Sequence, residues 1–494
     1  MARVFPVVVA VASIAGCAQL AGIDNTSGSG RTGNSLEVTR MSIGNQVVLA
    51  PLDLAGLPAQ YLLKTDSPGG FDRVYATPSG PGLWTQDLAE PAPVEFRLPD
   101  VPTPLPQIVS FPNQALKVLF AALEHPNPSP APSGAMLTVT TQLDVASTMN
   151  DSFQVFTVGS WTSRLLTAGV IGLTQVGPIG YAFSSSISQS GRAQLDRLTA
   201  QDAFFVLRYA GAALTGVAEA PPFDQTGADM VVTPQMTPVV QDQTLDIKVN
   251  PPALAARYAA VRPAVTSLSM NWSAVAAPGY RIASNVGPML QGGPLPIADV
   301  GVSAKYGNPF VARDWHTIFT LQTSESRQAM LPGPMGLLPV TLVAGMNQYI
   351  EPSVGITLGL DAGLPELISI GGKQLAADWS STNPTGQTIP QPTTFLEVTF
   401  VSEHPNDTLY TLQVFDFVLN TAGTAFESHP VFSATTNEPG FEVPPEILQA
   451  GHYYTLRVMS ISGGYPGIAE GDLTNRQLPL SQSYLDSGVF LVTP

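Results

Sequence analysis

The chain is 494 residues long, carries a formal net charge of −16 and contains a single cysteine. Its 21 basic against 37 acidic residues argue against a nucleic-acid-binding protein, because phosphate contacts need clustered Lys and Arg. A hydrophobic share of 44% argues against disorder, and the length predicts two to four domains with sizeable cores.

The N-terminus has the pattern of an export signal. A short basic start, Met1-Ala2-Arg3, precedes a mostly apolar run from Val4 to Gly16. Because this run is shorter than the roughly twenty residues that a transmembrane helix needs, residues 1–16 are predicted to be a signal peptide.

The signal ends in Ile14-Ala15-Gly16-Cys17. This tetrapeptide resembles the bacterial lipobox, in which an aliphatic residue and two small residues precede an obligatory cysteine. The resemblance implies cleavage before Cys17, lipidation of Cys17 and stable anchoring; Ala18 in place of Asp implies the outer membrane. The alternative is an ordinary secretory signal with a chance cysteine. Residues 17–35 are then the acylated cysteine and a flexible tether, whose second half is rich in Ser, Gly, Asn and Thr.

Beyond the tether, short runs that alternate apolar and polar residues predict β-strands separated by turns. The clearest runs are Leu137–Leu143, Leu396–Phe400, Tyr410–Phe415 and Tyr453–Val458. Little helix is expected, because proline is spread along the whole chain. Two segments could form short helices, namely Leu254–Val261 and Arg192–Leu198. The fold class predicted is all-β, with antiparallel β-sandwiches in tandem.

Six short landmarks recur in the same order along the chain, which predicts an internal duplication. The plainest is Glu124–Asn127 (EHPN), which recurs as Glu403–Asn406. The others are Leu116–Phe120 with Leu396–Phe400, Phe204–Arg208 with Tyr453–Arg457, Gly216–Glu219 with Gly467–Glu470, Ala55–Pro58 with Ala362–Pro365, and Asn45–Gln46 with Asn347–Gln348. The predicted units are residues 36–225 and 335–494, separated by an unmatched middle β region, residues 226–334.

The second unit contains the sequence LQAGHYYTLRV from Leu448 to Val458. It resembles the E–F corner and F strand of fibronectin type III domains, which are sandwiches of the immunoglobulin-like kind. The resemblance covers about residues 385–494 and implies that the hydroxyl of Tyr454 binds the backbone. It also implies strand B at Leu396–Phe400 and strand C at Tyr410–Leu419. In the first unit Phe205 takes the position of Tyr454 and has no hydroxyl.

No pattern marks a catalytic or metal site. The five histidines, which form neither an HExxH motif nor an H-x-H pair, are His125, His316, His404, His429 and His452. No G-x-S-x-G nucleophile turn occurs. The EHPN segments could place a carboxylate beside an imidazole at a loop tip, but Pro and Asn favour a simple turn. We expect no catalytic residue, no metal and no cofactor.

Candidate ligand contacts concentrate in the middle region. Aromatic side chains beside Arg and Asp suit the recognition of sugars or peptides, by stacking together with a charge-assisted hydrogen bond. The residues are Tyr306, Arg313, Asp314, Trp315 and His316. The alternative is that Phe310 and Trp315 lie in the core while Arg313 and Asp314 pair on the surface.

These patterns favour a lipid-anchored protein of the bacterial cell envelope, at the outer membrane and facing either the periplasm or the cell surface. It would act as a non-enzymatic binding or scaffolding module. The expected partners are the membrane, through the N-terminal lipid anchor, and an envelope protein or glycan. Two alternatives stay open: an exported hydrolase with its site in the middle region, and a structural subunit of a surface assembly that pairs through exposed strand edges.

Overall fold

The all-β prediction is confirmed, because the described residues form antiparallel and mixed sheets without an α-helix. Their only helical segments are the 3₁₀ turns Pro445–Ile447 and Ile468–Glu470. The computed structural model describes residues 33–43, 47–52, 54, 56, 59–97, 106–122, 136–157, 163–167, 172–182, 204–210, 213–219, 230–233, 235–238, 247–249, 269–277, 298–301, 316–334, 336–350, 356–358, 362–375, 387–402, 407–474, 477 and 479–494. Both segments that were predicted to form short helices lie outside these residues.

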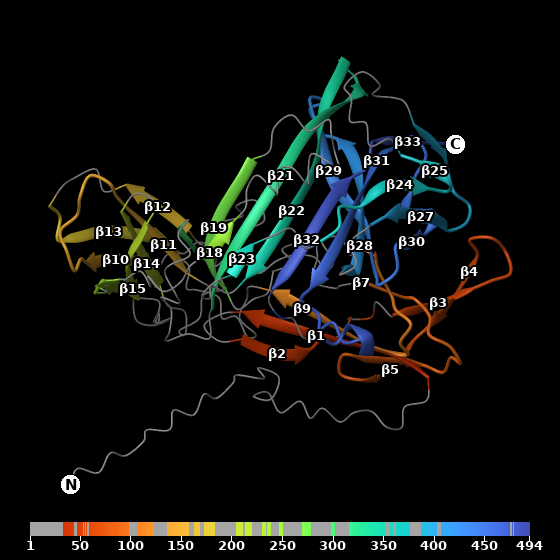
Figure 1. Cartoon of the computed structure of the whole chain (residues 1–494), viewed down its shortest axis with the longest axis horizontal. Coiled ribbons are helices and arrows are strands. Elements are labelled where there is room, and N and C mark those ends of the chain that lie inside the picture. Colours follow the sequence, from red (N-terminus) through yellow and green to blue (C-terminus); the bar gives the residue numbers. More distant parts are fainter. Residues whose placement is uncertain are drawn as a thin grey trace, which may run out of the picture.

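One path of hydrogen-bonded strands joins N-terminal, middle and C-terminal parts of the described chain (Figure 1). Its first half passes from β4 (Phe71–Tyr75) through β3 (Gln60–Lys64), β7 (Val94–Arg97), β8 (Pro106–Ser110), β29 (Phe426–Thr436), β28 (Asp407–Leu419) and β31 (Tyr453–Gly463) to β32 (Leu480–Asp486). Its second half continues through β22 (Gly336–Ile350), β21 (His316–Gly333), β19 (Ser269–Ala277), β20 (Ala298–Gly301), β15 (Ala213–Glu219), β14 (Phe204–Ala210) and β11 (Asp151–Thr157) to β12 (Ser163–Thr167). Every pair on it is antiparallel except β8–β29.

The parallel pair β8–β29 joins distant parts of the sequence. Gln107 to Ser110 of β8 lie in register with Ser433 to Thr436 of β29. The first strand belongs to the predicted first unit and the second strand to the predicted second unit. The main sheet therefore runs across the two predicted units.

The C-terminal residues form two sheets that share one hydrophobic core. The smaller sheet has the order β25 (Lys373–Gln374), β24 (Glu366–Ile370), β27 (Leu396–Val401), β30 (Gly440–Val443). Val398 and Phe441 from it belong to the same buried cluster as Leu412 and Val458 from β28 and β31. The three strands predicted here from alternating residues, in β27, β28 and β31, are confirmed.

Aromatic rings fill this core at the end of β27. The ring of Phe400 lies 5.1 Å from that of Tyr410, edge to face, and 5.8 Å from that of Phe441, stacked. Such pairs contribute about 0.5–1.5 kcal/mol beyond the burial of their surface. Phe400 thus anchors the end of β27 in this core.

Tyr454 makes the backbone contact that was predicted for it. The Gln449 N–H donates a hydrogen bond to the Tyr454 hydroxyl at 2.9 Å, and the neighbouring Leu448 is completely buried. Burial, together with the Asp416 carboxylate, raises the pKa of Tyr454 to about 12, although the bond to Gln449 opposes the rise. The side chain therefore pins the turn that leads into β31.

The first predicted unit repeats part of this arrangement, in the order β12–β11–β14–β15 for residues 151–219. In the C-terminal part the strands β29–β28–β31–β32 pair in the corresponding order. In both sets the first two strands of the sheet are neighbours in the chain, and the last two follow them in the sequence. A second sheet joins β10 (Met136–Gln142), the strand predicted at 137–143, to β13 (Gln175–Ala182) and β16 (Met230–Val232). The landmark pair Phe204–Arg208 and Tyr453–Arg457 therefore occupies matching strands.

Other landmark pairs do not occupy matching strands. Leu116–Phe120 lies in β9 (Ala115–Ala122), which pairs in parallel with β1 (Asn34–Ile43), whereas Leu396–Phe400 lies in β27 between β24 and β30. Gly216–Glu219 lies in β15, whereas Ile468–Glu470 forms a 3₁₀ turn. Both EHPN segments lie outside the described residues.

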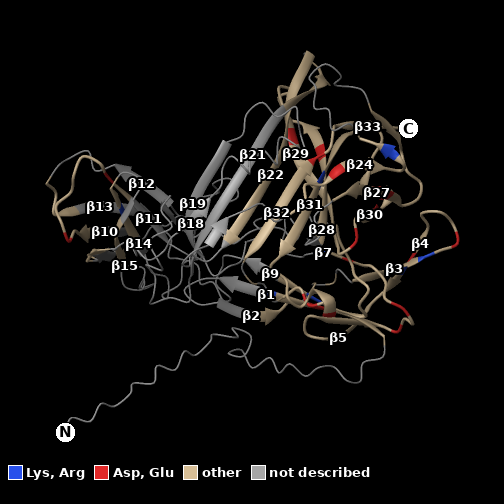
Figure 2. Cartoon of the chain, in the orientation of Figure 1, with Lys and Arg blue, Asp and Glu red and all other residues tan. Residues whose placement is uncertain are grey.

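A second buried cluster covers the opposite face of the C-terminal main sheet. It combines Leu36, Trp84 and Phe96 of the N-terminal strands with Met459 and Ile461 of β31. The sheet with β1 and β9 also contains β2 (Val47–Pro51), β5 (Thr77–Gly80) and β6 (Leu83–Gln86). Charged residues are few over the described ribbon, which fits a fold held mainly by apolar contacts (Figure 2).

Replacing Tyr454 by Phe removes the acceptor for the Gln449 N–H while keeping the buried ring. We expect the free energy of unfolding to fall by about 0.5–1.5 kcal/mol, the net contribution of one ordinary hydrogen bond. Urea denaturation of both proteins measures the change. Tyr75→Phe is the matched control, since Tyr75 is 62% exposed, and it should change stability by less than about 0.5 kcal/mol. Equal losses in the two variants would contradict the role of the hydroxyl.

Candidate functional site

Most residues predicted as contacts lie outside the described part of the chain. These are Cys17, Tyr306, Arg313, Asp314 and Trp315. His316 begins strand β21, but its side chain is not described. Their roles stay predictions.

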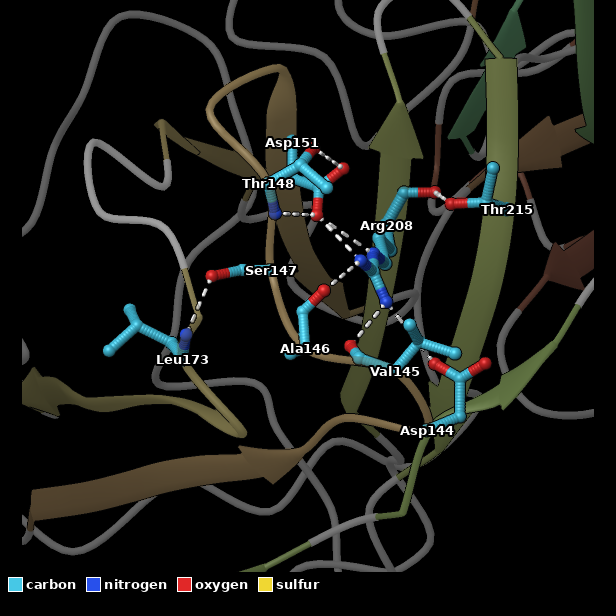
Figure 3. A network of polar contacts seen from close by, with 9 residues as sticks. All are labelled: Asp144, Val145, Ala146, Ser147, Thr148, Asp151, Leu173, Arg208 and Thr215. Carbon is cyan, nitrogen blue, oxygen red and sulfur yellow. Dashed lines mark hydrogen bonds and ion pairs between the residues drawn. The ribbon is translucent and has the colours of Figure 1, made fainter.

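The described residues contain a different polar site, centred on Arg208 of strand β14 (Figure 3). Arg208 is only 6% exposed. Its Nε and Nη2 donate to one carboxylate oxygen of Asp151, at 3.2 and 2.6 Å. Its Nη1 contacts Asp144 at 3.3 Å. One guanidinium thus pairs with two acids.

The same guanidinium also binds the backbone of the loop between β10 and β11. Nη1 donates to the carbonyl oxygen of Val145 at 2.8 Å, and Nη2 donates to that of Ala146 at 3.2 Å. Residues 144–151 are called the 144–151 loop below. A buried charge with this many partners fixes the loop in one conformation, because each bond restricts the backbone that makes it.

Two further sets of bonds hold the 144–151 loop. The Thr148 N–H and hydroxyl donate to the two oxygens of Asp151, at 2.8 and 3.1 Å. Ser147 binds the neighbouring turn: its N–H donates to the Leu173 carbonyl at 2.8 Å, and its hydroxyl accepts from the Leu173 N–H at 3.0 Å. The loop and residues 172–173 therefore form one unit.

The charge state of Asp151 follows from these contacts. Burial alone would raise the pKa of Asp151, but bonds from the Thr148 amide, the Arg208 guanidinium and the Thr148 hydroxyl lower it below 3.8. The Coulombic attraction of Arg208 acts in the same direction. Asp151 is therefore ionised at neutral pH and paired with Arg208.

The 144–151 loop presents apolar side chains to solvent. Val145 is 62% exposed and Met149 is 71% exposed, while Leu173 on the attached turn is 36% exposed. In the same loop Asp151 and Ser147 are buried. The loop thus exposes apolar side chains beside the exposed polar residues Asp144, Thr148 and Asn150. Exposed apolar side chains on a fixed loop are a feature of contact surfaces.

The C-terminal sheets hold further close contacts between charged or titratable side chains. Arg457 of β31 binds Asp486 of β32 through Nε at 2.6 Å and Nη2 at 3.0 Å. His452 Nδ1 lies 2.9 Å from Asp416 Oδ2. Burial raises the pKa of Asp416, although the hydrogen bond and charge of His452 oppose the rise. The side chain of His429 is exposed, and its Nε2 lies 3.5 Å from Oε2 of Glu427.

Sequence reasoning missed the Arg208 site, although one signal was present. Arg208 interrupts the apolar run Phe204–Ala210, and a charge inside a buried strand requires a partner. The partners lie 57 and 64 residues away, at Asp151 and Asp144. Nothing in the spacing of these residues identifies the pairing.

The sequence matches no known family model, and no curated protein is significantly similar to it. Within the described ranges, no group of three or more His, Cys, Asp and Glu residues could hold a metal ion. Among those same ranges, no helix is long and apolar enough to cross a bilayer.

Replacing Arg208 by Met leaves the Asp151 carboxylate buried without its cation. We expect a loss of about 3–5 kcal/mol in the free energy of unfolding at pH 7, measured by urea denaturation. Backbone amides of the 144–151 loop should also exchange faster with deuterium. The control is Arg97→Met, because the Arg97 side chain is 45% exposed and its contact with Glu95 is 4.0 Å long. That variant should lose less than about 1 kcal/mol.

The effect of Arg208→Met should depend on pH. Because the pKa of Asp151 is lowered in the folded chain, its contribution to stability is present above pH 3.8. That contribution is lost as the pH falls through the folded-state value. The difference between wild type and Arg208→Met should therefore shrink below pH 3.8. A difference that is independent of pH would contradict the ion pair.

Proposed function

We propose that the chain is a lipid-anchored protein of the bacterial cell envelope that acts as a non-enzymatic binding module. The observation that carries the proposal is the 144–151 loop, in which buried Arg208 binds the carbonyls of Val145 and Ala146 while the side chains of Val145 and Met149 are exposed. Binding residues are often found on loops that a rigid scaffold positions. A fixed apolar loop also loses little entropy when a partner covers it.

We assign about residues 385–494, together with β24, to a fibronectin type III-like sandwich. Sandwiches of the immunoglobulin-like kind place strands A, B and E in one sheet and strands C, F and G in the other. The order β24–β27–β30 opposite β28–β31–β32 supports this assignment, and so does the contact between Tyr454 and Gln449. The strand order of residues 151–219 supports a second sandwich around the 144–151 loop. Such sandwiches serve many binding roles, so the fold by itself names no ligand.

The anchor is proposed from the lipobox-like Ile14–Cys17 and the tether that follows it. Acyl chains on Cys17 would hold the binding module at the outer membrane while residues 18–35 separate it from the bilayer. A tethered module meets envelope partners at a high local concentration, so modest contacts suffice.

Replacing Cys17 by Ser removes the only thiol that a lipid could modify. We expect wild-type protein in the membrane fraction of bacterial cells, labelled by an added alkyne fatty acid, and Cys17→Ser protein without label in the soluble fraction. The matched control adds Ser13→Cys to the Cys17→Ser variant. It restores a thiol four residues before the motif's cysteine position, and the protein should stay unlabelled. Labelled Cys17→Ser protein would contradict the anchor.

A photoreactive amino acid at Met149 tests the binding surface in cells that make the full chain. We expect a discrete crosslinked envelope protein from position 149, because the exposed side chain would lie against the partner. Position 337 is the control, since Leu337 is also exposed, at 55%, but lies on another strand. Loosening the loop by Arg208→Met should reduce the product. Equal products from positions 149 and 337 would contradict a specific surface.

A further inference from the structure

The free end of the long β21–β22 hairpin carries an uncharged surface. No charged residue occurs in the sequence between Arg327 and Glu351. We call residues 328–341 the hairpin tip. Figure 2 shows it without acidic or basic residues, and in Figure 1 it extends to the outer edge of the described strands. Its last pairs are Met330↔Pro339, Leu331↔Leu338, Pro332↔Leu337 and Gly333↔Gly336.

The two faces of the hairpin tip have different surroundings. One face packs on the C-terminal core, because Leu331 and Val340 belong to its buried cluster. Residues in register, and residues two apart on one strand, share a face. The other face therefore consists of apolar residues only, namely Met330, Pro332, Leu337 and Pro339. The two prolines and Leu337 are exposed, Leu337 at 55%. The core thus fixes a tip whose outer face is apolar.

The strand edges of the hairpin tip are poorly suited to pairing with a further strand. Among the described strands, β19 pairs with β21 only as far as Ser324, and β32 pairs with β22 only from Ala344. A proline within a paired strand takes a position whose N–H would point away from the partner strand. Pro332 and Pro339 therefore remove one outward donor from each edge. This disfavours edge-to-edge pairing, and it also removes donors that would be costly in an apolar environment.

The neighbouring turn between β28 and β29 is uncharged as well. Residues 417–426 contain no charged side chain, and a Cβ added to Gly423 would lie 3.9 Å from Pro334 Cγ. This turn satisfies its own donors. The Thr424 and Ala425 N–H groups donate to Asn420 Oδ1 at 2.9 and 3.3 Å, and the Gly423 N–H donates to the Asn420 carbonyl at 2.9 Å. Two adjacent turns thus form one uncharged end of the sheet.

We infer that the hairpin tip inserts its outer face into the surface of a zwitterionic lipid bilayer. An apolar, uncharged tip suits lipid, whereas the net charge of −16 on the chain opposes an anionic surface. Apolar segments enter the bilayer interface by about 5–10 Å. The strand rises by about 10 Å from Met330 to Gly333, so the apolar pairs fill this depth. The next pair on the same face, Gln328↔Thr341, is polar and would lie among the headgroups. The inference goes beyond the proposed function and does not require a lipid on Cys17.

A fluorescent label on the hairpin tip tests the insertion directly. Cys17→Ser removes the only cysteine, so adding Leu337→Cys to that full chain gives a single labelling site. With phosphatidylcholine vesicles we expect a nitrobenzoxadiazole label at position 337 to brighten, to shift to the blue and to be quenched by spin-labelled lipid. Leu367→Cys in the same chain is the matched control, because Leu367 is 54% exposed and lies on β24. A label at position 367 should not respond.

Flotation of the Cys17→Ser chain with the same vesicles measures the contribution of Leu337 to binding. Leu337→Asp should lower the partition coefficient by at least about tenfold, because a carboxylate then replaces an apolar side chain in the interface. Leu367→Asp should leave the partition coefficient unchanged. Because the tip is uncharged, binding should be the same between about 0.1 and 0.5 M salt. Thermal melting of each variant shows whether it is folded.

Three outcomes would overturn the inference: no response of the label at position 337 to vesicles, equal responses at positions 337 and 367, and a response at position 337 that needs only a higher protein concentration. The last would mean that a second copy of the chain covers the tip. These experiments use a chain without Cys17, so the tip and the lipid anchor can fail separately. A tip in lipid gives no discrete crosslinked protein, so position 337 also remains a valid control for position 149.

Discussion

The pairing of β32 with β22 is the interaction on which the rest of the structure depends. Six residue pairs, from Ala344↔Leu485 to Tyr349↔Leu480, join the C-terminal sheets to the long β21–β22 hairpin. Through β21 and β19 the hairpin continues to the strands that carry the Arg208 site. In Figure 1 the hairpin runs between these two groups of strands. Asp486 reinforces the junction, because the carboxylate that binds Arg457 also accepts the Val343 N–H.

Since one sheet continues through so much of the chain, both of its faces need cover. On the C-terminal part, the small sheet with β27 covers one face, and the N-terminal strands with Trp84 and Phe96 cover the other. The N-terminal strands reach this position through the parallel pair β8–β29. Folding thus requires contacts between residues more than three hundred positions apart. Such contacts form slowly, because the chain loses loop entropy before it gains their energy.

The sequence predicted what depends on local patterns. Alternation located the strands β10, β27, β28 and β31, and the resemblance of Leu448–Val458 to a fibronectin type III corner implied the backbone bond that Tyr454 makes with Gln449. It could not predict which strands pair, because β-pairing has no local signature. The duplicated LxVxF pattern shows this limit: Leu116–Phe120 and Leu396–Phe400 read alike, but β9 pairs with β1 while β27 pairs with β24 and β30. The Arg208 site was missed for the same reason, because its acids come from distant positions.

Two arginines at matching positions of the predicted repeats hold different parts of the fold. Arg208 and Arg457 end the matching segments FFVLR and YYTLR, on strands with the same order of neighbours. Arg208 draws its acids from the preceding loop and from β11, so it fixes a loop. Arg457 draws its acid from the following strand, β32, so it fixes a strand junction and lies between two aromatic rings. The same residue type thus stabilises a loop at one position and a strand junction at the other, because an arginine in a sheet requires an acid but does not specify which segment supplies it.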